Sequence, residues 1–220
     1  VGHRVLHGGQ VYSKSIVVND DVKKVIKDCF PLGPLHNPAN LIGIEACEKA
    51  LPGKPQVAVF DTAFHQTMPP KAYMYAVPYD WYEKYKVRRY GFHGTSHSFV
   101  SKRVAEIVGK PYNATKTIVC HLGNGASVSA VLNGESVDTS MGLTPLEGLP
   151  MGTRSGDIDP AIVQFVANKE GKTVDEMLNI LNKQSGMLAV SGKSSDFRDL
   201  NDGMDAGDER CTLALELFAY

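Results

Sequence analysis

The loop at residues 142–159 carries a side chain that suits anion chemistry. Its sequence, GLTPLEGLPMGTRSGDID, shows no hydrophobic periodicity and holds one arginine, Arg154, among Gly, Thr and Ser residues. The planar guanidinium of an arginine can donate two parallel hydrogen bonds to a phosphate or a carboxylate. The alternative is an exposed arginine beside a flexible turn. The residue types favour an anion site that includes Arg154.

A second candidate anion site is the turn Gly123-Asn124-Gly125, within the segment TIVCHLGNGASVSAVLNGESVDTS at residues 117–140. The β-branched and alternating residues of this segment predict a β-meander, with a further turn at Asn133-Gly134. Two glycines place bare backbone N–H groups in the first turn, where a phosphate can approach without meeting a Cβ atom. Neither a GxGxxG fingerprint nor a Walker A sequence occurs. We therefore expect any phosphate site here to be a hairpin turn.

A first polar cluster, His3, Arg4 and His7, lies in the opening segment VGHRVLHGG. Taken alone, it suits the solvated edge of a strand. A zinc site is disfavoured, because Gly8-Gly9 argues against a helix and no third ligand has a suitable spacing.

Two further clusters follow, around Asp61 and around His93. Asp61 comes directly after the apolar run VAVF, and a carboxylate at the end of a buried strand lies where open α/β sheets bind ligands. The alternative is an aspartate that caps the following turn. In YGFHGTSH, we expect Thr95 or Ser96 to cap a helix. His93 and His97, taken singly, are of a kind that is more often structural than catalytic.

The composition is that of an average soluble globular protein, with 43% hydrophobic and 21% charged residues. The formal net charge of −1 favours neither nucleic acid nor an anionic membrane as a partner. No apolar run is long enough to span a bilayer. The four scattered cysteines predict reduced thiols of a cytoplasmic protein. Because both ends of the chain interrupt structured-looking sequence, we expect it to be a fragment of a longer protein.

Strands and helices alternate in the pattern of an α/β protein. In the first third of the chain we expect two strands within 2–18, a helix at 20–30, a helix from Asn37 to near Gly53, and a strand at 57–60 that is buried on both faces. Residues 66–90, rich in Pro, Tyr and Met, predict a long connection.

The remaining helices are predicted by their caps and by their apolar spacing. After residues 94–96, the residues Phe99, Val100, Val104, Ile107 and Val108 predict one apolar helix face, closed by Gly109. Asp159-Pro160 predicts a helix start. The sequence Thr173-Val-Asp-Glu176 predicts a capping box for a helix that ends near Gly186.

Five motifs in order resemble the acetate kinase family. They are HRVLHGG, VFDTAFHQTMP, RRYGFHGTSH, CHLGNGASV and DTSMGLTPLEGLPMGTRSGDIDP, and SSDFRD at 194–199 extends the match. The resemblance implies a ribonuclease-H-like, actin-like ATPase architecture with parts of two similar domains. Residues 1–68 would be the C-terminal part of the first, acyl-substrate domain, and residues 69–220 the N-terminal part of the second, nucleotide-binding domain. The boundary falls at the Pro69-Pro70 linker.

The resemblance also implies roles for individual residues. Arg4 would bind the carboxylate or phosphate of the acyl substrate, and Asp61 would be the active-site acid at the domain hinge. His93 and Arg154 would stabilise the transferring phosphoryl group. The ATP phosphates would contact His121, Leu122, Gly123, Asn124 and Gly125. The base and ribose would lie near Asp196, Phe197 and Arg198. The pocket for the acyl methyl group would be lined by Leu6, Leu35, Phe92 and Pro145.

The implied activity is acetate kinase: reversible phosphoryl transfer from ATP to acetate, giving acetyl phosphate and ADP. The family's lysine-containing phosphate hairpin and its magnesium-binding glutamate have no counterpart in this chain, so we expect Mg²⁺ ligands mostly outside it and no activity from this stretch alone. We also expect exposed apolar surface near Val5 and 57–60, where neighbouring strands would be missing. A cytoplasmic homodimer acting in acetyl-CoA biosynthesis is the expected setting.

One implied role needs a chemical qualification. Acetate is already ionised at neutral pH, so it needs no general base, and Asp61 is better interpreted as orienting an arginine or the metal. Three alternatives remain open: a propionate kinase, which differs by one methylene in the pocket; a sugar or polyol kinase; and a non-enzymatic actin-like nucleotide-binding protein.

Overall fold

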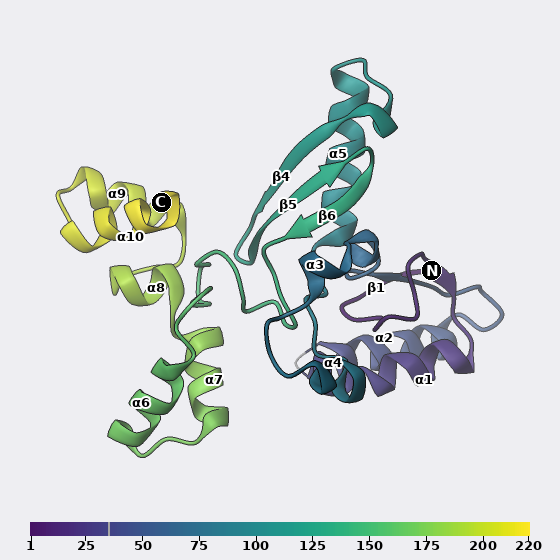
Figure 1. Cartoon of the computed structure of the whole chain (residues 1–220), viewed down its shortest axis with the longest axis horizontal. Helices are drawn as coiled ribbons and strands as arrows, with labels where there is room; N and C mark the ends of the chain where they lie inside the picture. Colours follow the sequence, from purple (N-terminus) through teal and green to yellow (C-terminus); the bar gives the residue numbers. More distant parts are fainter. Residues whose placement is uncertain (35) are drawn as a thin grey trace. The chain divides into compact units, whose positions relative to one another are not determined.

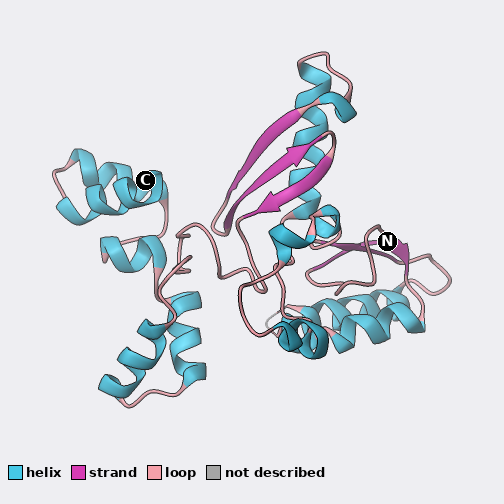
Figure 2. Ribbon diagram, in the orientation of Figure 1, coloured by secondary structure: helices cyan, strands magenta, loops and turns pink. Residues whose placement is uncertain are grey.

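The computed structural model describes residues 1–34 and 36–220, so Leu35, expected in the acyl pocket, lies outside the described residues. The chain forms two compact units (Figures 1 and 2). Unit 1 comprises Val1–His121 and Val128–Pro145, and unit 2 comprises Leu122–Ser127 and Leu146–Tyr220. These units do not coincide with the expected division after residue 68, which stays a prediction about the domains of the family.

Unit 1 begins with a three-stranded sheet covered by two helices (Figure 1). The strands are β1 (Gly2–Val5), β2 (Ile16–Val17) and β3 (Val57–Phe60), in the order β1-β3-β2. The helices are α1 (Asp20–Asp28) and α2 (Asn37–Ala50). β3 runs parallel to β1 and antiparallel to β2, so β1 and β3 end at the same edge of the sheet.

The core of this sheet buries the apolar residues that we expected to be exposed. Val5, Ala58 and Phe60 are buried, and they pack with Ile26 and Ile44 of the two helices. The expectation was wrong because α1 and α2 cover this face. Along β3, burial alternates between buried and half-buried positions, so the strand is not fully buried on both faces.

A buried amide, Asn37, fixes the chain after β1 against the start of α2. Its Oδ1 accepts a hydrogen bond from the His7 N–H at 3.0 Å. Its Nδ2 donates to the carbonyl oxygens of His7 and Ile26, at 3.0 and 3.1 Å. Asn40, one turn later, accepts from the Leu6 N–H at 3.0 Å. The segment that follows Arg4 is therefore held by α2.

The connection 66–90 contains more regular structure than the sequence predicted. It begins within the short 3₁₀ helix η2 (Phe64–Thr67) and includes α3 (Pro70–Tyr73) and α4 (Tyr79–Tyr85). A further 3₁₀ turn, η1 (Phe30–Leu32), follows α1. Proline supports η1 and α3 at their first turns, because its fixed φ is compatible with a helix start.

The second sheet of unit 1 is the predicted meander. Its strands are β4 (Lys116–Leu122), β5 (Ala126–Leu132) and β6 (Glu135–Thr139), in the order β4-β5-β6. The turn between β5 and β6 places Asn133 and Gly134 at φ values of 53° and 86°, as the Asn-Gly pair predicts. The 3₁₀ turn η3 (Tyr112–Ala114) precedes β4.

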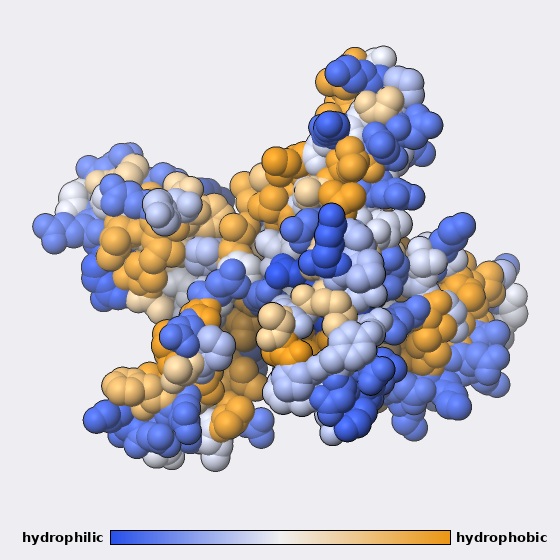
Figure 3. Space-filling view, in the orientation of Figure 1, coloured by the Kyte–Doolittle hydropathy of each residue, from blue (hydrophilic) through white to orange (hydrophobic). Residues whose placement is uncertain are grey.

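Helix α5 (Gly94–Ile107) differs from its prediction in two ways. It begins at Gly94 with His93 as its N-cap residue and without a side-chain cap, so neither Thr95 nor Ser96 caps it. Its buried positions are Gly94, His97, Ser101 and Ala105. The expected apolar face is largely exposed instead, with Phe99 at 69% and Ile107 at 70%. Figure 3 also shows apolar surface along β4.

In the described part of the chain, unit 2 consists of five helices, the loops that join them and the glycine-rich turn before β5. Its helices are α6 (Ala161–Glu170), α7 (Val174–Lys183), α8 (Gly186–Ser191), α9 (Phe197–Asp205) and α10 (Glu209–Ala219). The predicted capping box of Thr173 and Glu176 is confirmed at the start of α7. Met187, Leu200, Cys211 and Ala214 form a small core beneath α8, α9 and α10. No helix in the described ranges combines the length and the apolar character that a membrane crossing needs.

We predict that Asn37→Ala destabilises the protein by about 2–4 kcal/mol, because it leaves buried backbone groups of His7 and Ile26 without their partner. Urea unfolding of the full-length protein measures this change. Asn182→Ala is a matched control, since this exposed amide makes one hydrogen bond within α7. Equal effects of the two substitutions would contradict the anchoring role of Asn37.

Candidate active site

An arginine–carboxylate pair lies where the parallel strands of unit 1 end. Arg4 Nε is 3.1 Å from both carboxylate oxygens of Asp61, and Nη2 is 2.5 Å from Oδ2. Asp61 is 3% exposed, whereas the Arg4 side chain is 53% exposed. The carboxylate is therefore neutralised within the protein, and the guanidinium keeps surface that an anionic ligand can contact.

The start of α5 is joined directly to Asp61. The Gly94 N–H donates to the Asp61 carbonyl oxygen at 2.9 Å. A Cβ atom at residue 94 would lie 2.2 Å from that oxygen, so only glycine allows this approach. His93, the preceding residue, is the N-cap of α5 and has a left-handed backbone conformation with a φ of 57°. The structure thus brings Arg4, Asp61 and His93 together in unit 1.

Three histidine rings gather behind this edge. The ring centroids of His93 and His121 are 4.0 Å apart, and that of His97 is 6.4 Å from His93 and 6.2 Å from His121. His121 Nδ1 shares a 2.8 Å hydrogen bond with Ser96 Oγ. Among the residues expected to contact the ATP phosphates, His121 belongs to unit 1, whereas residues 122–125 belong to unit 2.

Two of the residues expected to line the acyl pocket are buried within unit 1. Leu6 and Phe92 are 2% and 1% exposed. Phe92 packs edge-on against His7, the neighbour of Leu6, with 5.7 Å between ring centroids. Pro145 is half-buried at the end of unit 1. Leu6 and Phe92 are therefore both buried side chains of unit 1.

Unit 2 joins the glycine-rich turn to the arginine loop. The Gly152 N–H donates to the Asn124 carbonyl oxygen at 3.1 Å, and within the turn the Gly123 N–H donates to the Gly125 carbonyl oxygen at 3.2 Å. A Cβ atom at Gly152 would lie 2.2 Å from Asn124 Oδ1. Two of the expected anion-binding segments are therefore packed against each other.

Arg154 is held by backbone contacts of the same loop. The Met151 N–H donates to the Arg154 carbonyl oxygen at 3.0 Å, and the Met151 carbonyl accepts from the Met187 N–H at 2.9 Å. The guanidinium approaches Met151 Sδ at 3.8 Å. The N–H group of Met187, at the start of α8, thus holds the loop at Met151.

Asp196 and Arg198, expected near the nucleotide, form the start of α9 with Phe197. Asp196 is the N-cap residue, and its Oδ1 accepts from the Arg198 N–H at 2.9 Å. Its other oxygen pairs with Arg198 Nη2 at 2.7 Å. The Arg198 guanidinium lowers the pKa of the Asp196 carboxyl to about 2, so this exposed group is ionised at neutral pH.

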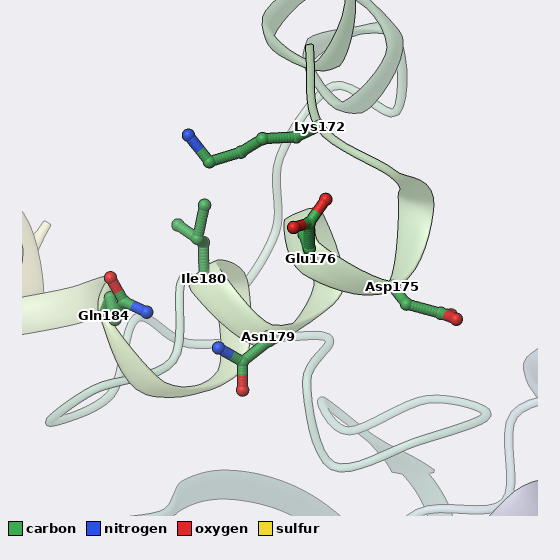
Figure 4. A pocket seen from close by; sticks show the side chains of 6 residues that line it. All are labelled: Lys172, Asp175, Glu176, Asn179, Ile180 and Gln184. Atoms are coloured by element: carbon green, nitrogen blue, oxygen red, sulfur yellow. The ribbon is translucent and has the colours of Figure 1, made fainter. Parts of the chain in front are cut away.

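A hollow on α7 involves none of the expected site residues. It is lined by Lys172, Asp175, Glu176, Asn179, Ile180 and Gln184. Figure 4 shows Ile180 pointing toward the Lys172 side chain while Asp175 points away. Glu176 is already engaged in the capping box with Thr173. Within residues 1–34 and 36–220, no three His, Cys, Asp or Glu side chains gather where they could hold a metal ion.

The sequence did not predict the contacts that three polar residues, Ser96, His65 and Asn37, make in the fold. Ser96 was considered as a helix cap, but it contacts His121. His65 lies in the motif VFDTAFHQTMP and Asn37 at the predicted start of a helix, and both bind backbone groups distant in sequence. Their polar character at buried positions is the only local signal, because buried polar side chains require partners.

Solved structures define the class of this fold. The chain matches the crystal structure of Porphyromonas gingivalis acetate kinase with a TM-score of 0.94 and 53% identity, over 99% of this chain and 55% of that one. It matches a propionate kinase from Francisella tularensis subsp. tularensis SCHU S4 with a TM-score of 0.96 and 52% identity, over 99% and 56%. The fold is of the actin-like ATPase type, which confirms the expected class.

The model of the acetokinase family matches residues 1–220, and the chain belongs to this family. It is 64% identical to the acetate kinase of Lachnoclostridium phytofermentans and 63% identical to that of Agathobacter rectalis, each over its full 220 residues. It spans 56% and 55% of the length of these two relatives.

We predict a loss of stability on mild acidification. Burial lowers the pKa values of His7 and His65 to about 4 and that of His97 to about 3, with Arg88 contributing at His7. Below pH 6.5 the unfolded chain binds protons at these residues and the folded chain does not, so the free energy of unfolding falls as the pH decreases from 7 to 5.

Urea unfolding at several pH values in this range measures the effect. Each histidine contributes a slope of up to about 1.4 kcal/mol per pH unit, and carboxylates stay largely ionised in both states. His97→Gln removes one of the three contributions and is expected to lower the slope. A free energy of unfolding that stays constant from pH 7 to 5 would contradict the prediction.

Proposed function

We propose that the full-length protein is an acetate kinase, transferring a phosphoryl group reversibly between ATP and acetate to give ADP and acetyl phosphate. The observation that carries the proposal is the Arg4–Asp61 pair beside His93, at the end of two parallel strands. Membership of the acetokinase family supports it.

The mechanism that we propose relies on positioning and on charge neutralisation, which dominate catalysis of phosphoryl transfer. The exposed part of the Arg4 guanidinium binds the acetate carboxylate, and Asp61 fixes its orientation through the hydrogen bonds to Nε and Nη2. Acetate attacks as the carboxylate, so no proton has to be removed from it. Leu6, Phe92 and Pro145 surround its methyl group.

The phosphoryl group would be stabilised by His93 and Arg154, and the ATP phosphates by the residues His121 to Gly125. Support for the latter comes from the hydrogen bond that joins the glycine-rich turn to the loop of Arg154. Asp196, Phe197 and Arg198 would lie near the base and ribose. In this assignment residues 1–68 belong to the acyl-substrate domain and residues 69–220 to the nucleotide-binding domain.

Mg²⁺ would accompany the ATP phosphates, since this ion commonly uses one or two carboxylates and several phosphate oxygens. The described residues form no cluster of metal ligands. We further propose a cytoplasmic homodimer acting in acetyl-CoA biosynthesis.

A single assay separates the alternatives. The full-length protein, Mg-ATP and either acetate, propionate or glycerol are mixed, and ADP and the phosphorylated product are measured. We expect the highest kcat/KM with acetate. Propionate is the nearest competitor, since one of the matched structures is that of a propionate kinase. Preference for glycerol indicates a polyol kinase, and nucleotide binding without transfer to any acceptor indicates a non-enzymatic protein.

We predict that Arg154→Ala lowers kcat at least ~100-fold with a smaller effect on the KM for ATP, because removing a donor to the transition state costs about 2.7–4 kcal/mol. Steady-state kinetics of the full-length protein test this. Arg103→Ala removes an exposed arginine paired with Glu106 on α5 and serves as the matched control. Turnover within a few-fold of wild type for Arg154→Ala would make it a surface residue.

We predict that Asp61→Asn leaves the shape of the pH–rate profile unchanged between pH 6 and 8, because Asp61 orients Arg4 and takes no proton from acetate. kcat falls at every pH, since the neutral amide binds the guanidinium more weakly than a carboxylate does. An acidic limb that is present in the wild type and lost in Asp61→Asn would identify Asp61 as a general base.

A further inference from the structure

We propose that His65 is a positioning residue of the phosphoryl-transfer site, which holds the backbone at Phe92 so that His93 faces the reacting groups. The proposal rests on the proposed function and adds a residue that does not touch substrate. His65 lies on η2, four residues after Asp61, and is fully buried.

Both ring nitrogens of His65 are used. Nε2 is 2.9 Å from the Phe92 carbonyl oxygen, and Nδ1 is 2.8 Å from Ser136 Oγ. A carbonyl oxygen can only accept, so Nε2 carries the proton and Nδ1 accepts from the Ser136 hydroxyl. Burial lowers the pKa of His65 to about 4, which keeps this neutral tautomer at neutral pH.

The segment that His65 holds has an unusual backbone. Gly91 and His93 have φ values of 73° and 57°, and a positive φ is uncommon for a residue other than glycine. Such a conformation persists where its surroundings impose it. On one side of His93, the Phe92 carbonyl is bound by His65. On the other side, the Gly94 N–H is bound by the Asp61 carbonyl.

His65 also shapes the turn sterically. A Cβ atom at Gly91 would lie 2.8 Å from the His65 ring and 2.4 Å from Thr139 Cγ2. The ring of His97 also packs against His65, with 5.6 Å between the two ring centroids. His65 therefore fits closely among the turn, α5 and β6, and a change of its shape or hydrogen bonds shifts Phe92 and His93 relative to Asp61.

The experiment compares two replacements of His65 in the full-length protein. His65→Gln keeps a donor for Phe92 and an acceptor for Ser136, whereas His65→Phe keeps a ring and loses both hydrogen bonds. We expect His65→Phe to lower kcat on the order of 100-fold, the loss typical of a reacting group misplaced by about 1 Å, with the KM for ATP within about threefold of wild type. We expect His65→Gln to recover most of kcat.

Thr67→Val is the matched control for a merely structural effect. Thr67 lies on the same short helix, and its hydroxyl donates to the Ser136 carbonyl at 2.8 Å without contacting Phe92. We expect Thr67→Val to lower the unfolding temperature and to leave kcat within about twofold of wild type. An equal loss of kcat in Thr67→Val, or no recovery in His65→Gln, would overturn the proposal.

Ser136→Ala covers the case in which His65→Phe does not fold. It leaves Nδ1 without its donor, and we expect a loss of kcat between about threefold and thirtyfold, where a factor of ten corresponds to about 1.4 kcal/mol. Wild-type kcat in both Ser136→Ala and His65→Gln, with His65→Phe unfolded, would show that His65 serves folding only and would overturn the proposal.

A crystal structure of His65→Gln or Ser136→Ala gives a readout that does not depend on the acceptor. We expect the backbone at residues 91–93 to shift in Ser136→Ala and to keep its position in His65→Gln, and an unchanged turn in Ser136→Ala with lowered kcat would contradict the positioning role. If the wild type transfers no phosphoryl group to acetate, the proposed function fails, and the shift of this turn still tests what His65 does.

Discussion

Burial of the Asp61 carboxylate is the constraint on which the arrangement of unit 1 depends. An ionised carboxylate taken out of water is strongly unfavourable unless a charge and hydrogen bonds compensate for the lost hydration. Arg4 supplies both, through Nε and Nη2. It can do so because β1 and β3 are parallel neighbours, with Val5 opposite Phe60. A shift of β1 by one residue would turn Arg4 to the opposite face of the sheet and leave the carboxylate unpaired.

The same strand end determines what can follow it in space. The Asp61 carbonyl accepts the Gly94 N–H, and the 2.2 Å approach of a Cβ atom at residue 94 excludes any larger residue without movement. The N-terminus of α5 therefore begins against β3, with Gly94 as its first residue, and the Gly94 N–H meets a backbone carbonyl. Because α5 starts at Gly94, Ser96 lies within the first turn of the helix and not at its N-cap, and its hydroxyl is in contact with His121.

Local chemistry made much of this fold predictable, and the misses share one cause. The meander, the Asn133-Gly134 turn and the capping box at Thr173 depend on neighbours within a few residues, which the sequence displays directly. The roles of Ser96, His65 and Asn37 depend on partners 25, 27 and 30 residues away. The face of α5 was misjudged similarly, since its small residues pack against η2 and β3 while the apolar ones stay outside. The family motifs indicated which residues matter in the site, and only the fold indicates which residues hold them.

The charges of unit 1 suggest why its site needs so much support from neutral groups. Guanidinium groups stay protonated in proteins, and Arg4 supplies one that pairs with Asp61. His65 and His97 are kept neutral by burial, so they add no charge that varies with pH. In the proposed reaction the acceptor is a carboxylate that is already ionised, and such an acceptor requires a constant positive charge and a fixed distance to the phosphoryl donor. His65, neutral and hydrogen-bonded through both ring nitrogens, can fix such a distance without attracting the anion itself. Under the proposed function, the division between charged residues that would bind the acceptor and neutral residues that would position them follows from the chemistry of a carboxylate acceptor.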